Sequence, residues 1–198
     1  MDEFEIRTFW DAEANGFDAE VDHGLTTPEA RSAWWELMRD LLPPAPSRVA
    51  DLGCGTGSLS VLLAEHGYDV VGTDLSPAMI QHAKRKADAH GLVIDFDVGD
   101  ASQPDLRDGT FDVVLARHLA WALPDPSTAL DAWFRLLRPD GRAVLIEGRW
   151  STNAGLTADE LTALVEPAAR VTEVRQLTNA SLWGHEITDE RYALVARH

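Results

Sequence analysis

A glycine-rich turn, followed about 20 positions later by an acidic residue, is the clearest chemical signal in this sequence. The segment DLGCGTG, residues 51–57, lies where a short apolar run passes into a helical pattern. Glycines at such a junction permit a tight turn and a close approach of the backbone to a ligand. Asp74 ends the next apolar run, where a carboxylate can accept both hydroxyls of a ribose. The pair predicts a nucleotide-type cofactor.

The residues around the turn favour a cationic cofactor over a dinucleotide. A nicotinamide-binding turn needs a third glycine three positions after Gly55, where this sequence has Ser58. The Asp51 carboxylate would repel a pyrophosphate but suits a positively charged amine. S-adenosylmethionine carries such an amine and a sulfonium. A nicotinamide oxidoreductase is therefore disfavoured, although it stays open as a hypothesis.

Several segments resemble class I S-adenosylmethionine-dependent methyltransferases of the small-molecule type. VADLGCGTGSLS is similar to the family's cofactor-binding turn, VVGTDL to its acidic second strand, and Gly99-Asp100-Ala101 to its adenine-contacting loop. FDVVLARHLAWALPDP is similar to its fourth strand and substrate-side loop, and LLRPDGRAVLIEG to its turn into the fifth strand. The resemblance covers roughly Arg48 to Gly148. It implies S-adenosyl-L-methionine as cofactor and methyl transfer to a small-molecule acceptor by in-line displacement.

The resemblance assigns parts of the cofactor to matching positions. Asp51 and the backbone of residues 53–57 would hold the methionine moiety, and Asp74 would hold the ribose. Leu75 and Met79 would sandwich the adenine. The full set expected at the cofactor is Asp51, Gly53, Cys54, Gly55, Thr56, Gly57, Asp74, Leu75, Met79, Asp100, Ala101 and Arg117.

The remaining contacts in that set are also implied by the resemblance. Asp100 would accept a hydrogen bond from the adenine amino group, and Ala101 would offer its backbone. The backbone of Arg117 would face the methionine amine. Cys54, the single cysteine, is expected to pack as a small hydrophobic side chain rather than to react, since nothing indicates a lowered thiol pKa.

Three histidines are candidates for the group that removes a proton from the acceptor, because neutral histidine is available near neutral pH. His118 is the preferred base, since it directly follows the predicted fourth strand, at the edge where such sheets bind ligands. His23 precedes the first predicted helix, and His185 lies between the two last predicted strands. All three could equally be histidines without a chemical role.

Aromatic and polar residues complete the predicted acceptor site. Trp34 and Trp133 are expected in the core, whereas other tryptophans fall in segments near the pocket, where they can hold a flat or cationic group or act as core filler. The predicted acceptor-side residues, besides the histidines, are Trp10, Trp121, Glu147, Arg149, Trp150 and Trp183. No spaced set of metal ligands stands out, so no metal is expected.

Apolar runs that alternate with amphipathic stretches predict an α/β fold. We expect a Rossmann-like, doubly wound, mostly parallel sheet of about seven strands, with a late antiparallel strand and helices on both faces. Strands are predicted at residues 48–52, 68–73, 92–98, 111–116, 142–147, 171–177 and 191–196. Helices are predicted at residues 29–42, 58–66 and 76–91, from Pro126 onward, and from Thr157 to about Ala169. The first of these is expected to open with a capping box that Glu29 closes.

The length of 198 residues suits one domain, residues 1–198. Residues 1–45 would be an N-terminal helical lid and substrate segment, residues 46–150 the cofactor-binding core, and residues 151–198 the strands that complete the sheet. The lack of a basic, apolar leader at the amino terminus and the single cysteine predict a cytoplasmic protein. A monomer or a homodimer is expected.

Charge narrows the range of partners. The sequence has 33 acidic and 17 basic residues, a formal charge of −16, which repels nucleic acid and anionic membranes. A small-molecule substrate is therefore expected, with no nucleic acid and no membrane partner. A protein methyltransferase and a non-catalytic S-adenosylmethionine-binding protein remain the alternatives, because a fold and a cofactor site do not establish a reaction.

Overall fold

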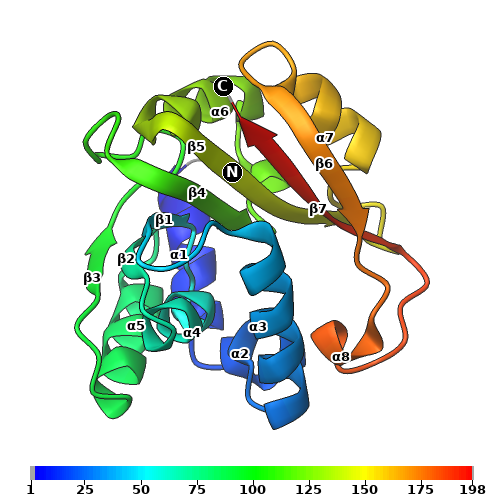
Figure 1. Ribbon diagram of the computed structural model, residues 1–198. Coiled ribbons are helices and arrows are strands. Elements are labelled where there is room, and N and C mark those ends of the chain that lie inside the picture. Colours follow the sequence, from blue (N-terminus) through cyan, green and yellow to red (C-terminus); the bar gives the residue numbers. More distant parts are fainter. Residues whose placement is uncertain (1–2, 198) are drawn as a thin grey trace.

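One seven-stranded sheet forms the centre of the computed structural model, which describes residues 3–197 (Figure 1). The strand order is β3-β2-β1-β4-β5-β7-β6. Strands β1 to β5 pair in parallel, and β7 runs antiparallel to both β5 and β6. The predicted Rossmann-like sheet with a late antiparallel strand is confirmed. The strands are β1 (Arg48–Leu52), β2 (Asp69–Asp74), β3 (Asp95–Val98), β4 (Phe111–Arg117), β5 (Leu137–Arg149), β6 (Arg170–Gln176) and β7 (Glu190–Arg197).

Helices cover both faces of this sheet (Figure 1). They are α1 (Glu3–Glu13), α2 (Val21–Gly24), α3 (Pro28–Leu41), α4 (Ser58–Glu65), α5 (Pro77–Ala89), α6 (Pro126–Leu136), α7 (Ala158–Val165) and α8 (Ala180–Trp183), with 3₁₀ turns η1 (Phe17–Ala19) and η2 (Ala120–Ala122). In the part of the chain that is described, no helix has both the length and the apolar composition that a membrane crossing needs.

Alternation along the strands divides the core into two layers. Val113 and Leu115 of β4 pack on the side of α3 and α4, whereas Val114 packs on the side of α6 and α7. Trp34 and Trp133, both fully buried, anchor the two layers, as the sequence predicted. Their indole nitrogens donate to the carbonyls of Leu182 (2.9 Å) and Ala101 (2.7 Å), respectively. The Trp133 bond ties a core residue directly to the predicted adenine loop.

Side-chain caps define most helix starts, and one predicted cap is wrong. Ser76, Asp125 and Thr157 each accept a hydrogen bond from the third residue of the helix that follows, and Thr157 forms a complete capping box. Helix α3 also has a threonine cap, because Thr27 accepts from the backbone N–H of Ala30 at 3.1 Å. The third helical position is thus an alanine, so Glu29 cannot close the expected capping box.

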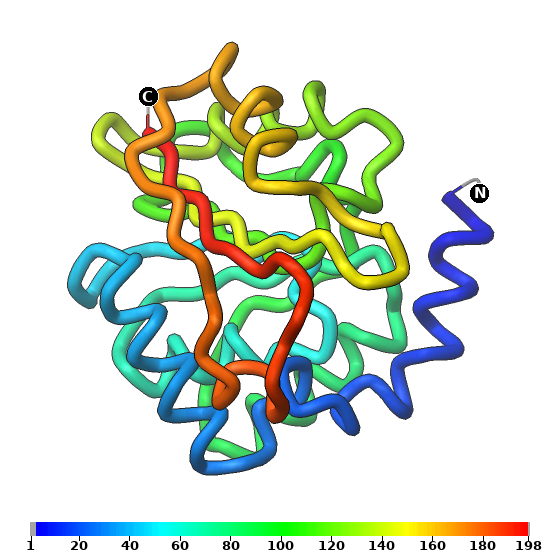
Figure 2. Tube along the Cα trace, turned by 90° about the vertical axis from the view of Figure 1, so that its right-hand side faces the viewer, coloured from blue at the N-terminus to red at the C-terminus, as the bar shows by residue number. Residues whose placement is uncertain are grey.

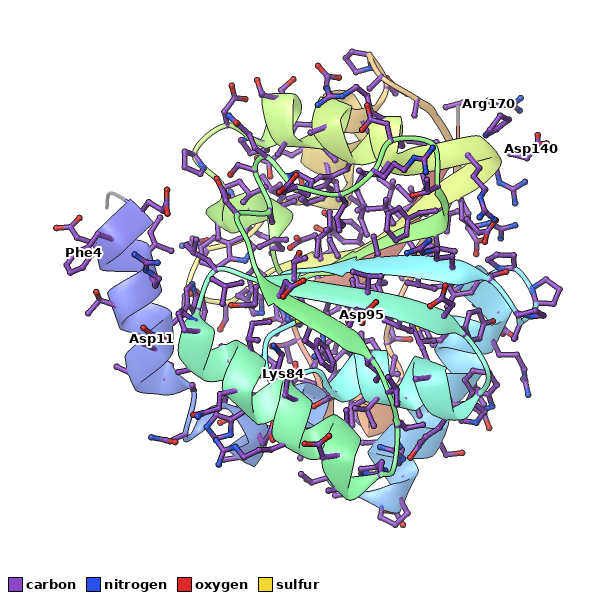
Figure 3. The ribbon with its side chains drawn as sticks, turned by 90° about the vertical axis from the view of Figure 1, so that its left-hand side faces the viewer. Phe4, Asp11, Lys84, Asp95, Asp140 and Arg170 are labelled. Carbon is purple, nitrogen blue, oxygen red and sulfur yellow. The ribbon has the colours of Figure 1, made fainter. Side chains whose placement is uncertain are left out.

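The N-terminal segment, predicted as a helical lid, contains a helix, α1, for which the sequence analysis set no bounds. No residue of α1 is buried, although Ile6 and Trp10 line the cavity described below. The helix stands at the outside of the molecule (Figure 2), beside α5, and Phe4 points away from the body (Figure 3). Asp11 fixes it there, since its carboxylate accepts from Ser76 Oγ (2.5 Å) and from the backbone N–H of Ala78 (3.1 Å).

Replacing Trp133 with alanine tests whether this side chain supports the fold. We expect Trp133→Ala to lower the free energy of unfolding by about 3–5 kcal/mol, because it empties a fully buried site and leaves the Ala101 carbonyl without its donor. Urea denaturation monitored by far-UV circular dichroism measures the loss. Trp121→Ala is the control, since Trp121 is 38% exposed and should cost less than about 1 kcal/mol. Equal losses would contradict the assignment.

Candidate functional site

A cavity of about 840 Å³ opens at the carboxyl ends of the parallel strands. This is the edge where doubly wound sheets bind their ligands. The walls come from the ends of β1, β2 and β4, from the segment between α1 and α3, and from the loop after β5 and the start of β7. Residues that are far apart in the sequence therefore meet at one site.

The glycine-rich turn lines one wall and requires glycine. Gly53 and Gly57 have φ angles of 65° and 76°, which other residues rarely adopt. A Cβ atom on Gly53 would lie 2.9 Å from Leu119, and one on Gly57 would lie 2.8 Å from the Cβ of Ala83. The turn thus packs against its neighbours on one side while Gly53 and Gly55 face the cavity on the other.

Asp51 faces the cavity from the end of β1 and is 3% exposed. Its Oδ2 atom accepts a hydrogen bond from Ser60 Oγ at 2.5 Å. Burial raises the pKa of Asp51 to about 6, although the Ser60 bond and the charge of Arg117 oppose this shift. A cationic group in the cavity would favour the ionised carboxylate.

Asp74 faces the same cavity from the end of β2. Its two oxygens accept from the backbone N–H groups of Ser76 and Gly55, each at 2.9 Å. Burial raises the pKa of this carboxyl, and the two backbone bonds counteract the shift. Asp74 therefore holds the glycine-rich turn and still presents lone pairs to the cavity.

The predicted adenine and methionine positions are brought together, with two exceptions. Cys54, Leu75, Met79, Asp100, Ala101 and Arg117 all line the cavity. Burial raises the pKa of the Cys54 thiol well above its usual range. Thr56 and Gly57 do not line the cavity. Thr56 instead donates to Asp18 at 2.5 Å and accepts from Lys86 at 3.0 Å, on the outer side of the turn.

His118 also lines the cavity, and it lies among aromatic rings. Its ring stacks near Trp183, with centroids 5.9 Å apart, and meets Trp150 edge-on at 5.2 Å. The Nε2 atom is buried, and no described residue forms a hydrogen bond with it. Burial, followed by the charges of Arg117, His23 and Arg191, lowers the pKa of His118 well below its usual range. The imidazole is therefore neutral at neutral pH.

His23 approaches from the N-terminal segment. Its ring stacks on Phe17, with centroids 4.3 Å apart, and lies 6.1 Å from the His118 ring. Burial lowers the pKa of His23, while the neighbouring Asp22 opposes that shift. Trp10, Trp121 and His185, which were also predicted, line the cavity as well.

Two predicted acceptor-side residues do not line the cavity, namely Glu147 and Arg149. Arg149 donates to the carbonyl of Gly155 at 2.6 Å. Glu147 is fully buried, and its Oε1 atom accepts from the backbone N–H groups of Leu119 (2.8 Å) and Ala120 (2.6 Å). Burial raises the pKa of Glu147 to about 8. Glu147 thus holds the loop that carries His118.

Other cavity residues were missed by the sequence analysis, among them Phe17, Asp22 and Arg191. Arg191 lies near the start of β7, in register with Gly148 near the end of β5. Because β7 is antiparallel to β5, its first residues lie at the same sheet edge as the cavity. The predicted antiparallel last strand could therefore have indicated Arg191. Its guanidinium lies over the rings of Trp150 (5.1 Å) and Trp183 (5.4 Å). Phe17 and Asp22 lie in a segment without a periodic pattern, and nothing in the sequence marks them.

Asp22, His23 and His118 also form a set that sequence spacing did not indicate. One ligand atom from each lies within 4.8 Å of the other two. Such a set could hold a metal ion, although Arg117 and Arg191 place positive charge beside it. The expected absence of a metal stays a prediction.

The residues present fit S-adenosylmethionine. Gly53 and Gly55 expose backbone to the cavity, Asp51 offers an anion for an ammonium group, and Asp74 offers acceptors for ribose hydroxyls. Leu75 and Met79 provide apolar walls for a flat base. These features share one cavity, as binding of a single extended ligand requires.

Comparison with known protein families supports this assignment. A family model described as a methyltransferase domain matches residues 50–145. This range runs from β1 into β5 and includes the glycine-rich turn, Asp74 and His118. The family match thus covers the part of the chain that builds most of the cavity.

Two curated relatives are similar over the same region. A demethylmenaquinone methyltransferase of Thermus thermophilus is 41% identical over 117 residues, which are 58% of this chain and 53% of that protein. A ubiquinone biosynthesis O-methyltransferase of Cereibacter sphaeroides is 39% identical over 109 residues, 54% of this chain and 44% of that protein. The chain spans about half the length of the curated relatives that it matches.

Solved structures share the fold at lower sequence identity. The putative methyltransferase in a complex with the Trm112 methyltransferase activator of Haloferax volcanii gives a TM-score of 0.75 at 21% identity, over 96% of this chain and 98% of that one. The [4+2]-cyclase SpnF gives a TM-score of 0.73 at 19% identity, over 83% and 80%. These likenesses show the fold alone.

The pH dependence of the free energy of unfolding tests whether Glu147 has a raised pKa in the folded chain. The pKa of Glu147 is about 8 in the folded chain and about 4.3 in the unfolded chain. Between these two pH values the folded chain keeps the Glu147 proton and the unfolded chain loses it. The free energy of unfolding must therefore fall as pH rises. We expect the free energy of unfolding to drop by about 1 kcal/mol per pH unit between about pH 5 and pH 8 through this residue. Urea titrations of wild type and Glu147→Gln isolate it, since glutamine does not titrate.

Glu186→Gln is the control for this experiment, because Glu186 is exposed. Its stability profile should run parallel to that of wild type. If the difference between wild type and Glu147→Gln is constant from pH 5 to pH 8, Glu147 does not carry a raised pKa in the folded chain.

Proposed function

We propose that this chain, which is similar to methyltransferases over residues 50–145, is an S-adenosylmethionine-dependent methyltransferase that transfers the cofactor's methyl group to a small, planar acceptor. The observation that carries this proposal is the single cavity onto which Asp51, the glycine-rich turn, Asp74 and His118 all open. Cofactor and acceptor residues that line one cavity suit transfer by in-line displacement. The sulfonium cofactor, when bound, supplies an already activated methyl group.

The acceptor end favours a flat molecule. His118, Trp150 and Trp183 surround it with ring faces and edges, and aromatic rings bind planar groups well. The two curated relatives described above are named for quinone biosynthesis, which agrees with a ring-bearing acceptor. The N-terminal segment and short loops enclose this end, which favours a small acceptor over a protein side chain.

We assign proton acceptance to His118. Its neutral ring and free Nε2 atom suit uptake of the proton that an acceptor hydroxyl releases as its oxygen gains the methyl group. Aromatic rings surround the imidazole, and Glu147 holds the loop on which it lies. A protein methyltransferase, the first alternative, would need an acceptor site that is open to a protein side chain. A protein that only binds S-adenosylmethionine, the second alternative, would not need a base.

Binding of S-adenosylhomocysteine, measured by calorimetry, tests the cofactor site. We expect S-adenosylmethionine and S-adenosylhomocysteine to bind, and Asp74→Asn to weaken both about 100-fold, because hydrogen bonds from ribose hydroxyls to a carboxylate are lost. Asp69→Asn is the matched control, since Asp69 lies at the opposite end of the same strand and is exposed. Its affinities should equal those of wild type.

Failure of both adenosyl ligands to bind would remove the basis of the proposal. Binding of NADH in their place would support the oxidoreductase alternative. An unchanged affinity in Asp74→Asn would show that the ligand does not use the end of β2.

Activity with a hydroxylated aromatic acceptor tests His118. Screening simple phenols and naphthols against the loaded protein identifies a usable acceptor. With it, we expect His118→Ala to lower kcat about 100- to 10,000-fold, as loss of a general base does, while S-adenosylhomocysteine affinity is retained. Because the pKa of His118 lies well below its usual range, the base form is complete above neutrality, so wild-type kcat should be flat from about pH 7 to pH 9.

His185→Ala is the matched control, since His185 is exposed at the cavity mouth and should change kcat little. Activity lost on chelation and restored by zinc would instead make Asp22, His23 and His118 a metal site and contradict the assignment of His118 as base. Equal activity of His118→Ala and wild type would also contradict it.

A further inference from the structure

Arg191 brings a cation to the aromatic part of the cavity, and the assignments above give it no role. It lies near the start of β7 and lines the cavity. Its guanidinium carbon lies 5.1 Å from the centre of the Trp150 ring and 5.4 Å from that of Trp183. The same two rings flank the ring of His118, at 5.2 and 5.9 Å. The proposed base and this cation therefore share two tryptophans.

The protein satisfies this guanidinium only in part. Asp189, which does not line the cavity, places its Oδ2 atom 3.1 Å from Nη1 of Arg191. The Nε and Nη1 atoms are buried, and within residues 3–197 neither has a hydrogen-bond partner. The side chain is 10% exposed, so water replaces few of the missing bonds. An anionic oxygen that enters the cavity beside Arg191 would therefore be stabilised, because it restores solvation that the cation has lost.

The charges that act on His118 have the same sign as Arg191. Burial is the largest cause of the lowered pKa of His118, and the charges of Arg117, His23 and Arg191 all lower it further. Positive charge around a neutral base favours a bound anion over a bound cation. The surroundings of His118 thus agree with the incomplete solvation of Arg191.

We propose that the acceptor is an aromatic hydroxy acid, whose carboxylate binds Arg191 while its hydroxyl faces His118. The inference rests on the proposed function, because it names the acceptor class of the same cavity. A planar guanidinium donates N–H groups in a geometry that suits a carboxylate. The carboxylate takes no part in the transfer: the hydroxyl oxygen gains the methyl group, its proton passes to His118, and the sulfonium becomes a neutral thioether. Arg191 would thus determine specificity rather than chemistry.

A purely structural role is the alternative. Arg191 contacts Trp150 and Trp183 and is paired with Asp189, whose Oδ2 atom also accepts from the backbone N–H of Ser151 at 3.2 Å. Arg191 could therefore serve only to hold the loop after β5. The two roles differ in one measurable respect. A structural arginine is indifferent to the charge of the acceptor, whereas a binding arginine discriminates between a carboxylate and the neutral amide of the same shape.

Calorimetry on the protein loaded with S-adenosylhomocysteine separates these roles without any turnover. The probes are 2-, 3- and 4-hydroxybenzoate, each compared with the hydroxybenzamide of the same substitution pattern. For wild type we expect at least one hydroxybenzoate to bind about 10- to 100-fold more tightly than its amide, the range for hydrogen bonds to a charged group. Arg191→Gln should reduce that preference to less than about threefold, with the affinity for the amide changed by less than about threefold.

Arg197→Gln is the matched control. Arg197 lies at the opposite end of β7 and does not line the cavity. Its variant loses the same charge from a chain whose formal charge is −16, so a general effect of net charge on anion binding would appear in both variants. Arg197→Gln should keep the wild-type preference for the carboxylate. Circular dichroism establishes that both variants are folded, and the wild-type comparison stands even if Arg191→Gln is not.

If no hydroxybenzoate binds wild type more tightly than its amide, the inference is overturned, whereas methylation of an uncharged phenol or naphthol would leave the proposed function intact. A parallel loss of affinity for both members of a pair in Arg191→Gln would also overturn it, in favour of the structural role. The same holds if Arg197→Gln loses the preference as fully as Arg191→Gln does. If wild type does not bind S-adenosylhomocysteine, the proposed function itself fails, and the inference fails with it.

Discussion

Burial of three carboxyl groups at the carboxyl edge of the parallel sheet is the constraint on which the site depends. Asp51, Asp74 and Glu147 each end or nearly end a strand, and desolvation raises the pKa of all three. Charges in such places persist only where donors satisfy them. Asp74 accepts hydrogen bonds from the N–H groups of Gly55 and Ser76, and Asp51 accepts one from the Ser60 hydroxyl. The loops of the cavity are therefore shaped by the demands of buried carboxylates.

Glu147 also accepts hydrogen bonds from backbone N–H groups, and the loop that it holds contacts the glycine-rich turn. Its bonds to Leu119 and Ala120 hold a loop whose first residue, His118, has a φ of 56°, a conformation that costs free energy outside glycine. Leu119 then packs on Gly53, where a Cβ atom would meet it at 2.9 Å. One buried carboxyl group thus holds the loop of His118 and, through Leu119, the contact with the glycine-rich turn.

The sheet and the cofactor wall were predictable because short-range signals encode them. Apolar runs, helix caps and the glycine-rich turn each depend on neighbours in sequence, and the mostly parallel sheet with its late antiparallel strand and the positions of Asp51 and Asp74 followed from them. The direction of a side chain at a strand end was not predictable in the same way. Glu147 turns toward backbone N–H groups rather than the acceptor, because only the folded loop supplies those donors.

The N-terminal segment shows the other limit of sequence reasoning and completes the cavity. Its contacts are mostly polar and near the surface: Asp11 bonds to Ser76 and Ala78, and Asp18 bonds to Thr56 and Lys86. The sequence predicted a helical lid in this segment but no bounds for α1, none of whose residues is buried.

The same contacts bear on how the cavity is reached. Segments with few buried apolar contacts open at lower free energy than a sheet core, so the wall formed by Phe17 and His23 is the part of the cavity that can move most readily. The central strands, by contrast, are buried on both faces and hold Asp51 and Arg117 in place. The fold thereby places Asp51 and Arg117 on central strands and covers them with a wall from the N-terminal segment, in which Phe17 stacks on His23.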